Sequence, residues 1–205
     1  MPDPKIPLEP GCYYHIYNRG TNRCKIFFEN SNYRHFLRLY DKHISPVANT
    51  LAWVLMGNHF HLLVQILPTN LLCPAVASSD QDESDDADER ITQQFSNLFN
   101  AYSKAINKRY NRTGSLFEHT FRRKQITDLE YLRKVVLYIH HNPVHHELCT
   151  HPSEYPWSSY LSCISIKPTK LQRAMVVGWF GDDASFKRMH EGKIEFEEIT
   201  KWLEI

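Results

Sequence analysis

Two histidines separated by one residue, His59 and His61, are the first candidates for chemistry in this sequence. They begin an apolar segment, His59 to Ile66, that we expect to form a β-strand. Side chains alternate between the faces of a strand, so both imidazoles point one way while Phe60 points into the core. Two imidazoles at this spacing can hold a divalent metal ion and leave most of its coordination sphere open, as a phosphate-activating centre requires. Two surface histidines on a half-exposed strand would give the same pattern.

A tyrosine in a later segment could supply a nucleophile. Lys134, Tyr138 and Asn142 are four residues apart along the helix expected from Asp128 to His141, so they share one face of it. A tyrosine hydroxyl has a pKa of about 10 and needs a nearby cation, which Lys134 or a metal-polarised phosphate would provide. Asn142 could reach the same metal ion. Alternatively, Tyr138 is a structural residue at the border of an amphipathic helix, where tyrosine is common.

A third set of residues is basic and interleaved with aromatic residues, as in surfaces that bind single-stranded nucleic acid. Cations follow the phosphate backbone while aromatic rings stack on bases. A solvated helix face next to a buried strand has a similar composition. The candidate DNA-binding residues, taken together with Lys134, are Lys104, Lys108, Arg109, Arg112, Arg122, Arg123 and Lys124.

The charge balance agrees with such a partner once one acidic segment is set aside. The net charge of the chain is only +1, but the segment from Asp80 to Arg90 alone holds seven acidic residues and one basic residue. The rest of the chain has 23 basic against 16 acidic residues. This surplus suits a phosphate backbone, although an ordinary solvated surface is equally compatible with it.

Composition also bears on where the protein works. The five cysteines are scattered and form no C-x-x-C pair, so we expect reduced thiols rather than a disulfide framework or a zinc knuckle. The N-terminal residues contain no basic-then-apolar signal segment, and no uncharged apolar run is long enough to cross a bilayer. We therefore expect a cytoplasmic protein with no membrane partner.

The remaining patterns predict the elements that position the candidate residues. The first half should contain a strand over 12–18, a helix over 30–44 capped by Asn30 or Ser31, and a hairpin of strands over 51–56 and 59–66 that turns at Gly57-Asn58. An acidic insertion over 68–90 should be irregular or disordered. The second half should contain a helix over 91–110, a strand over 115–126, and a helix that opens with the capping-box pattern Thr127-Asp-Leu-Glu130 and stops at Pro143.

This order of elements predicts an α+β sandwich around a central antiparallel sheet, because the hairpin requires antiparallel pairing. The length suffices for one sizeable core. We expect one domain over 11–160, which contains the insertion, and a helical C-terminal extension over 161–205.

Together these segments resemble the HUH transposases with one catalytic tyrosine, in particular the REP-associated tyrosine transposases of bacteria. The resemblance covers roughly residues 13 to 160. The acidic stretch over 78–90 is an insertion relative to that pattern. The ordered pair MGNHFHLLV and YIHHNPV is more specific than either motif alone. The other matching segments are YHIYNRGTNRCKIFFEN, NRTGSLFEHTFRRK and EYPWSSY.

The resemblance implies a ferredoxin-like sheet with helices on one face and a metal site in which His59 and His61 bind Mg²⁺ or Mn²⁺. It implies that Tyr138 is the catalytic tyrosine and that Asn142 completes the metal site, with His140 or His141 left open as the third ligand instead. Tyr138 would attack a phosphate in single-stranded DNA, form a 5′-phosphotyrosine and release a 3′-hydroxyl, which allows later rejoining without ATP. The partner would be hairpin-forming single-stranded DNA, bound by a monomer or a homodimer.

Two other functions are compatible with the same residues. A non-catalytic nucleic-acid-binding module, derived from a transposase, would use the basic surface but be indifferent to loss of Tyr138; the presence of both histidines and the tyrosine argues against it. A metal-dependent phosphodiesterase that activates water would need the histidines but would leave no covalent protein–DNA adduct.

Overall fold

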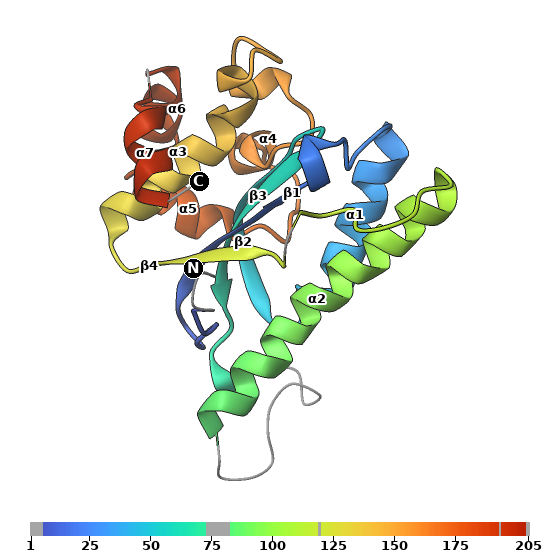
Figure 1. The fold of residues 1–205 in the computed structure, drawn as a ribbon. Coiled ribbons are helices and arrows are strands. Elements are labelled where there is room, and N and C mark those ends of the chain that lie inside the picture. Colours follow the sequence, from blue (N-terminus) through green and yellow to red (C-terminus); the bar gives the residue numbers. More distant parts are fainter. Residues whose placement is uncertain (1–5, 73–82, 119, 193, 204–205) are drawn as a thin grey trace.

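The computed structural model describes residues 6–72, 83–118, 120–192 and 194–203. At its centre is a four-stranded antiparallel sheet in the order β2-β3-β1-β4 (Figure 1). The strands are β1 (Tyr13–Arg19), β2 (Ala48–Leu55), β3 (His59–Ile66) and β4 (Arg122–Ile126). Helix α1 (Asn30–His43) joins β1 to β2, and α2 (Glu83–Arg109) lies between β3 and β4. This is the ferredoxin-like order, and the expected α+β sandwich is confirmed.

Helices cover both faces of the sheet rather than one, which corrects the arrangement implied by the resemblance. Helices α1 and α2 lie on one side, and α3 (Leu129–His145) lies on the other with the C-terminal helices (Figure 1). The reason is visible in β3, where Phe60 and Leu62 enter the core under α1 and α2 while Leu63 enters the core under α3. A strand that is apolar on both faces must be covered on both.

The predicted C-terminal extension forms short helices that pack into the core under α3. They are α4 (Tyr160–Ile164), α5 (Arg173–Trp179), α6 (Asp183–Glu191) and α7 (Phe196–Leu203). Val176, Phe186 and Ile199 from three of these helices are buried in the same cluster as Val136 of α3. Three short 3-10 helices, at Thr21–Arg23, Thr69–Leu71 and Pro152–Glu154, complete the secondary structure of the described residues. None of the described helices is both long enough and apolar enough to cross a bilayer.

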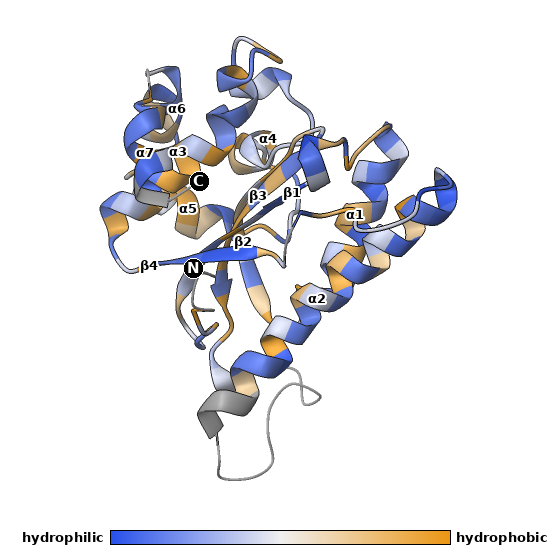
Figure 2. Ribbon diagram, viewed as in Figure 1, coloured by the Kyte–Doolittle hydropathy of each residue, from blue (hydrophilic) through white to orange (hydrophobic). Residues whose placement is uncertain are grey.

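Helix α2 begins inside the segment that the sequence predicted to be irregular, so the prediction for 68–90 is wrong from Glu83 onward. Residues 73–82 of that segment lie outside the described part of the chain. Asp88 explains the early start, because its carboxylate accepts hydrogen bonds from the Leu8 amide at 2.6 Å and from the Thr92 hydroxyl at 3.0 Å. Figure 2 shows alternating apolar and polar bands along the helix, whose apolar side chains face the sheet.

Helix α3 differs from its prediction at both ends. Its N-cap is Asp128, one residue later than Thr127, and the Asp128 carboxylate accepts hydrogen bonds from the amides of Glu130 and Tyr131. Its C-terminal end is also later, because Pro143 lies inside the helix. Proline removes one helical hydrogen bond near the end of the helix, but the His146 amide again bonds the Asn142 carbonyl at 3.1 Å, and burial of this turn offsets the loss.

Two smaller predictions are also corrected, and a third is confirmed. The N-cap of α1 is Glu29, not Asn30 or Ser31, because a reciprocal capping box forms between Glu29 and Asn32. Among the described residues of the strand predicted over 115–126, continuous pairing runs only from Arg122 onward, with one further bridge between Phe117 and Gly20. The β2–β3 hairpin is confirmed. Its turn residue Gly57 accepts hydrogen bonds from the amides of Ile26 and Phe27 through its carbonyl.

Candidate active site

The two histidines of β3 point to the same face of the sheet, as the strand alternation predicted. Phe60 and Leu62 are buried in the core under α1 and α2, whereas His59 and His61 face α3. Their ring centroids are 5.3 Å apart. The strand therefore holds two imidazoles side by side beneath a helix, not on an open surface.

Helix α3 brings Tyr138 and Asn142 to these histidines. The rings of Tyr138 and His61 pack edge to face, with centroids 5.2 Å apart and planes at 80°. One helical turn further, the Asn142 side-chain oxygen Oδ1 lies 3.0 Å from Nε2 of His59. Both α3 residues are almost fully buried. The four residues that the sequence predicted as catalytic or metal-binding are thus gathered at one place.

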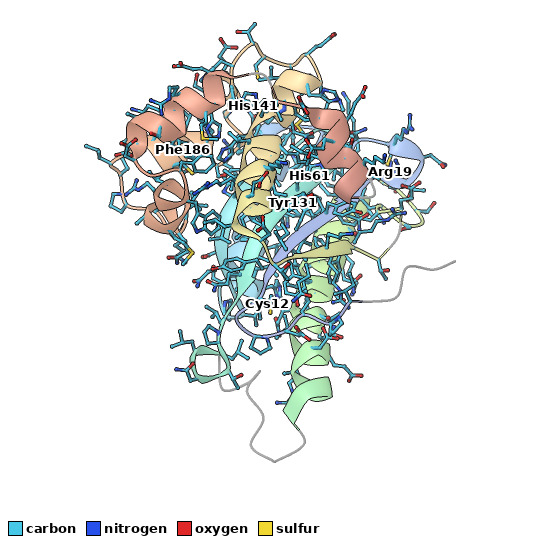
Figure 3. All side chains as sticks on the ribbon, turned by 90° about the vertical axis from the view of Figure 1, so that its left-hand side faces the viewer. Cys12, Arg19, His61, Tyr131, His141 and Phe186 are labelled. Carbon is cyan, nitrogen blue, oxygen red and sulfur yellow. The ribbon has the colours of Figure 1, made fainter. Side chains whose placement is uncertain are left out.

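These four residues line a cleft of about 610 Å³ between the sheet, α3 and α7. Figure 3 looks onto α3 with the sheet behind it, and His61 is labelled where the two layers meet. Besides the four predicted residues, the cleft is lined by Tyr17, Asn18, Arg19, Arg23, Asn58, Glu118, Arg122, His145, His146, Phe196 and Thr200.

Both metal-ligand candidates on β3 are neutral at physiological pH. Burial lowers the pKa of His59 to about 4, and burial together with the neighbouring histidines lowers the pKa of His61 well below its ordinary value. A neutral imidazole has one nitrogen lone pair available for a metal ion, whereas an imidazolium has none. The environment therefore keeps both rings neutral, which is the charge state that metal binding requires.

The contacts of His59 leave a conflict that a cation would relieve. Its Nδ1 lies 2.7 Å from Oδ1 of Asn58, and its Nε2 lies 3.0 Å from Oδ1 of Asn142. A neutral imidazole has only one N–H, so in one of these contacts a ring lone pair faces an oxygen lone pair. Exchange of oxygen and nitrogen in one amide removes the conflict, and so does a metal ion between Nε2 and Oδ1. The donor set of His59, His61 and Asn142 therefore fits a divalent ion. Within the described residues, no group of three or more His, Cys, Asp or Glu side chains could hold a metal ion, so a site here depends on the Asn142 amide oxygen beside the two histidines.

Tyr138 is not activated by its surroundings alone. Burial raises the pKa of Tyr138 to about 12, and a hydrogen bond with the Asn142 side chain opposes this rise only in part. A phenol with such a pKa is a weak nucleophile until positive charge arrives beside it.

Lys134 does not supply that charge, although it lies on the same helix face. Its ammonium group bonds Glu198 at 2.9 Å and Glu130 at 3.1 Å, and it is not among the residues that line the cleft. These two carboxylates raise the pKa of Lys134 above its ordinary value. Lys134 therefore links α3 to α7 in this structure.

Arginines from three other segments reach the cleft instead. Arg122 was predicted from its basic neighbourhood, whereas Arg19 and Arg23 were missed. Arg19 is paired with Glu118, which also lines the cleft. The signal that could have found Arg19 is its spacing in β1, where it falls on the same face as Tyr17 and opposite His59.

Arg123, which was predicted to bind DNA, points away from the cleft. Alternation along β4 places Arg122 and Lys124 on the face of the cleft and turns Arg123 to the other face, toward α2. Its guanidinium is 6% exposed, lies 3.6 Å from the Asp88 carboxylate and donates to the Thr92 hydroxyl. The structure does not bring Arg123 to the cleft. Lys124 is half-buried and lies directly opposite His15 of β1.

The remaining predicted cations also lie away from the cleft. Lys104, Lys108 and Arg109 are exposed on α2, on the opposite side of the sheet, and Arg109 is paired with Glu29. Arg112 follows the helix and places its guanidinium 3.7 Å from the Cys24 sulfur. The predictions for these four residues stay untested, but none of the four lines the site.

The C-terminal extension contributes to the site in a way that the sequence did not indicate. Phe196 at the start of α7 lies 5.2 Å from the Tyr138 ring, centroid to centroid, and Thr200 lies one turn further along the cleft wall. No motif marks these residues, because their role depends only on where the helix docks.

Comparison with known proteins identifies the fold. No family model matches the sequence, and no curated protein sequence does. A solved structure of a REP-associated tyrosine transposase bound to a REP hairpin matches with a TM-score of 0.59 at 17% identity, covering 82% of this chain and 89% of that chain. Two structures of a bacterial tRNA(His) guanylyltransferase-like protein, with ATP and with GTP, match at TM-scores of 0.39 and 0.42. Their identities are 9% and 8%, and they cover 65% and 69% of this chain and 57% and 68% of those chains, which is too weak to indicate a common fold.

The first of these matches extends over most of both chains, and it agrees with the sheet order and with the helices that flank it. The chain described here therefore has the fold of a REP-associated tyrosine transposase.

Proposed function

We propose that the protein is a metal-dependent DNA strand transferase that cleaves and rejoins single-stranded DNA through a 5′-phosphotyrosine on Tyr138. The observation that carries the proposal is the meeting of His61 and Tyr138, with ring centroids 5.2 Å apart, beside the contact of His59 with Asn142. A nucleophile and a candidate metal site thus share one cleft of a fold that is also that of a transposase.

His59, His61 and Asn142 would hold Mg²⁺ or Mn²⁺ through two ring nitrogens and one amide oxygen. Mg²⁺ prefers oxygen ligands, so this donor set favours Mn²⁺ of the two ions. A bound ion would polarise the scissile phosphate and withdraw negative charge from it. The side chain of Asn142 touches both His59 and Tyr138, and so would keep the nucleophile next to the metal site.

The reaction itself exchanges one phosphodiester for another. The Tyr138 oxygen forms a bond to phosphorus as the bond from phosphorus to the 3′ oxygen breaks, and the proton of the phenol ends on the released 3′-hydroxyl. The phosphotyrosine conserves the free energy of the bond, so a 3′-hydroxyl of another strand end can reverse the step without ATP. Arg19, Arg23 and Arg122 would bind the phosphate backbone, because guanidinium groups pair with phosphate oxygens in a bidentate manner.

The substrate class is single-stranded DNA with a hairpin. The support is the solved transposase, whose structure contains a REP hairpin, together with the arginines that line the cleft. The candidate nucleophile and the three candidate metal ligands of one chain meet in the cleft, and we propose that a single copy carries out the reaction.

The test is a cleavage assay with a pool of single-stranded oligonucleotides that share a hairpin and have random flanks, labelled at either end, in the presence of Mn²⁺. Wild type should form a covalent adduct that retains the 3′ label, and release a 5′-labelled fragment that ends in a 3′-hydroxyl. Tyr138→Phe and His59→Ala should form no adduct. Tyr131→Phe, on the same helix but outside the cleft, is the matched control and should react like wild type. Cleavage that persists in Tyr138→Phe would establish water as the nucleophile and overturn the proposal.

A further inference from the structure

The ring of the candidate ligand His61 stacks on a second histidine, which no motif marks as a site residue. His15 of β1 lies diagonally across the strand pair from His61, which faces Tyr17 directly. Nε2 of His15 is 2.9 Å from Nδ1 of His61, and the two rings are stacked, with centroids 5.0 Å apart and planes at 10°. His15 is fully buried and does not line the cleft. It can therefore influence the cleft only through the residues it contacts there, which are His61, Tyr17 and Tyr138. Its hydrogen-bond contact among them is with His61.

This contact determines what His61 presents to the cleft. One proton lies between the two nitrogens and belongs to one ring or the other. If His61 carries it on Nδ1, the ring donates to His15 and its Nε2 has a free lone pair. If His15 carries it on Nε2, the Nε2 of His61 is protonated and can donate to a phosphate oxygen but cannot bind a metal ion.

We propose that His15 is a positioning residue that accepts the Nδ1–H of His61 and thereby aims the unprotonated Nε2 of His61 at a divalent metal ion in the cleft. The inference rests on the proposed function for the nature of the ligand, a divalent cation. Metal-bound histidines generally donate their second N–H to a carboxylate or a carbonyl. Here the acceptor is an imidazole, which differs from both because it can also donate.

The surroundings of His15 make the two arrangements unequal. In the metal-binding arrangement the proton of His15 is on its own Nδ1, which is buried and has no hydrogen-bond partner among the described residues. Buried N–H groups without a partner are rarer and less favourable than buried acceptors without one. Without a metal ion, the pair therefore favours the arrangement with the proton on Nε2 of His61. Metal binding must move one proton within each ring, and the tautomers of both histidines should change together.

The tautomers can be observed directly by NMR on the full-length protein. Long-range ¹H–¹⁵N correlation spectra of the histidine rings would be recorded without metal and with saturating Mg²⁺, and assigned with His15→Gln and His61→Gln. We expect His61 to carry its proton on Nε2 without metal and on Nδ1 with Mg²⁺. A Mg²⁺-saturated spectrum in which His61 still carries the proton on Nε2 contradicts the proposal.

A pair of variants separates hydrogen bonding from packing. His15→Gln retains an acceptor oxygen toward His61, whereas His15→Phe retains a stacked ring and removes the acceptor. Titration of Mn²⁺ followed by electron paramagnetic resonance should show affinity about 10- to 100-fold weaker in His15→Phe, the effect typical of a lost second ligand shell, and near wild type in His15→Gln. Equal affinity of wild type and His15→Phe would overturn the proposal. If His15→Phe does not fold, the tautomers of the wild-type protein decide.

Neither measurement uses DNA, so the two proposals can fail separately. Mn²⁺ affinity that depends on His15, in a protein that forms no adduct with DNA, would support the role of His15 and refute the transferase. A wild-type protein that does not bind Mn²⁺ would refute the role of His15, whatever happens to DNA.

Discussion

Phe196 of α7 lies parallel to the ring of His145, with centroids 4.1 Å apart and planes at 9°, and at the same time packs against Tyr138. One aromatic ring thus joins the last turn of α3 to the candidate nucleophile. An ion pair between Lys134 and Glu198 also connects α3 to α7.

Removing this ring should change the acidity of Tyr138. Burial is the main cause that raises the pKa of Tyr138 to about 12, so Phe196→Ala, which admits water, should lower that pKa toward its ordinary value of about 10. The measurement is a pH titration of ring-carbon NMR signals in tyrosine-labelled protein, with Tyr138→Phe to assign the signal. An unchanged midpoint in Phe196→Ala would show that α7 does not exclude water from Tyr138.

A buried hydrogen-bond relay should contribute strongly to stability. His190 Nδ1 donates to the Phe186 carbonyl, so its Nε2 accepts from Nδ1 of His140, whose Nε2 in turn accepts from the Ser159 hydroxyl. His190→Ala leaves a buried N–H without a partner and creates a cavity, which should lower the free energy of unfolding by about 2–5 kcal/mol in urea denaturation. Met189→Ala, at its partly exposed neighbour, is the control and should cost much less.

Stability should fall steeply in mild acid. Burial lowers the pKa of His15 and His190 to about 3 and that of His59 and His141 to about 4. Above about pH 6.5 these histidines are neutral in both the folded and the unfolded protein, so they contribute nothing to the pH dependence of stability. Below it the unfolded chain binds protons that the folded protein cannot, so each histidine lowers stability by roughly 1.4 kcal/mol per pH unit until its folded pKa is reached.

Four such histidines exhaust a typical folding free energy of about 5–15 kcal/mol within about one to three pH units. We therefore expect the protein to unfold between about pH 5.5 and pH 3.5. Circular dichroism at a series of pH values measures this transition. His15→Gln removes one titrating ring and should make the decline shallower. A melting temperature that stays constant from pH 7 to pH 4.5 would be incompatible with this account.

Asp88 should contribute more to the stability of the fold than its position in an acidic segment implies. Its carboxylate compensates the guanidinium of Arg123, which is only 6% exposed, and also holds the Leu8 amide. Asp88→Ala should destabilise the fold by about 3 kcal/mol, because it leaves a buried charge without its partner. Glu89→Ala removes the same charge from an exposed neighbour and should leave the urea midpoint nearly unchanged. Equal midpoints for the two variants would mean that the carboxylate of Asp88 is dispensable.

DNA affinity should depend on the arginines that line the cleft and not on the cations of α2. Arg122→Ala should weaken binding to single-stranded DNA and reduce the slope of log affinity against log salt by about 0.7, the value for one lost phosphate contact. Lys104→Ala, which removes a cation on the far side of the sheet, should leave the slope unchanged. Fluorescence anisotropy at several salt concentrations measures both. The reverse result would place the DNA on α2, as the composition of that segment first suggested.

The sequence predicted those parts of the site that depend on periodicity within one element. The alternation of β3 paired His59 with His61, and helical spacing placed Tyr138 near Asn142. It could not reveal His15 or Phe196, because these side chains reach the site through strand register and helix docking, which no local pattern encodes. Local rules failed where tertiary contacts outweighed them. Burial accommodates Pro143 inside a helix, and Asp88 stabilises the start of α2 through contacts to distant residues.

Strand β4 lies at the end of the sheet and has a consequence for the solubility of the protein. An edge strand offers unpaired backbone groups to any other strand, and proteins commonly prevent such pairing with charged side chains. The five residues of β4 are Arg-Arg-Lys-Gln-Ile, and Figure 2 shows the strand as hydrophilic. The cations of β4 that point away from α2, Arg122 and Lys124, therefore keep neighbouring molecules from extending the sheet. Neutralising Arg122 and Lys124 together would promote aggregation, even in a variant whose fold is intact.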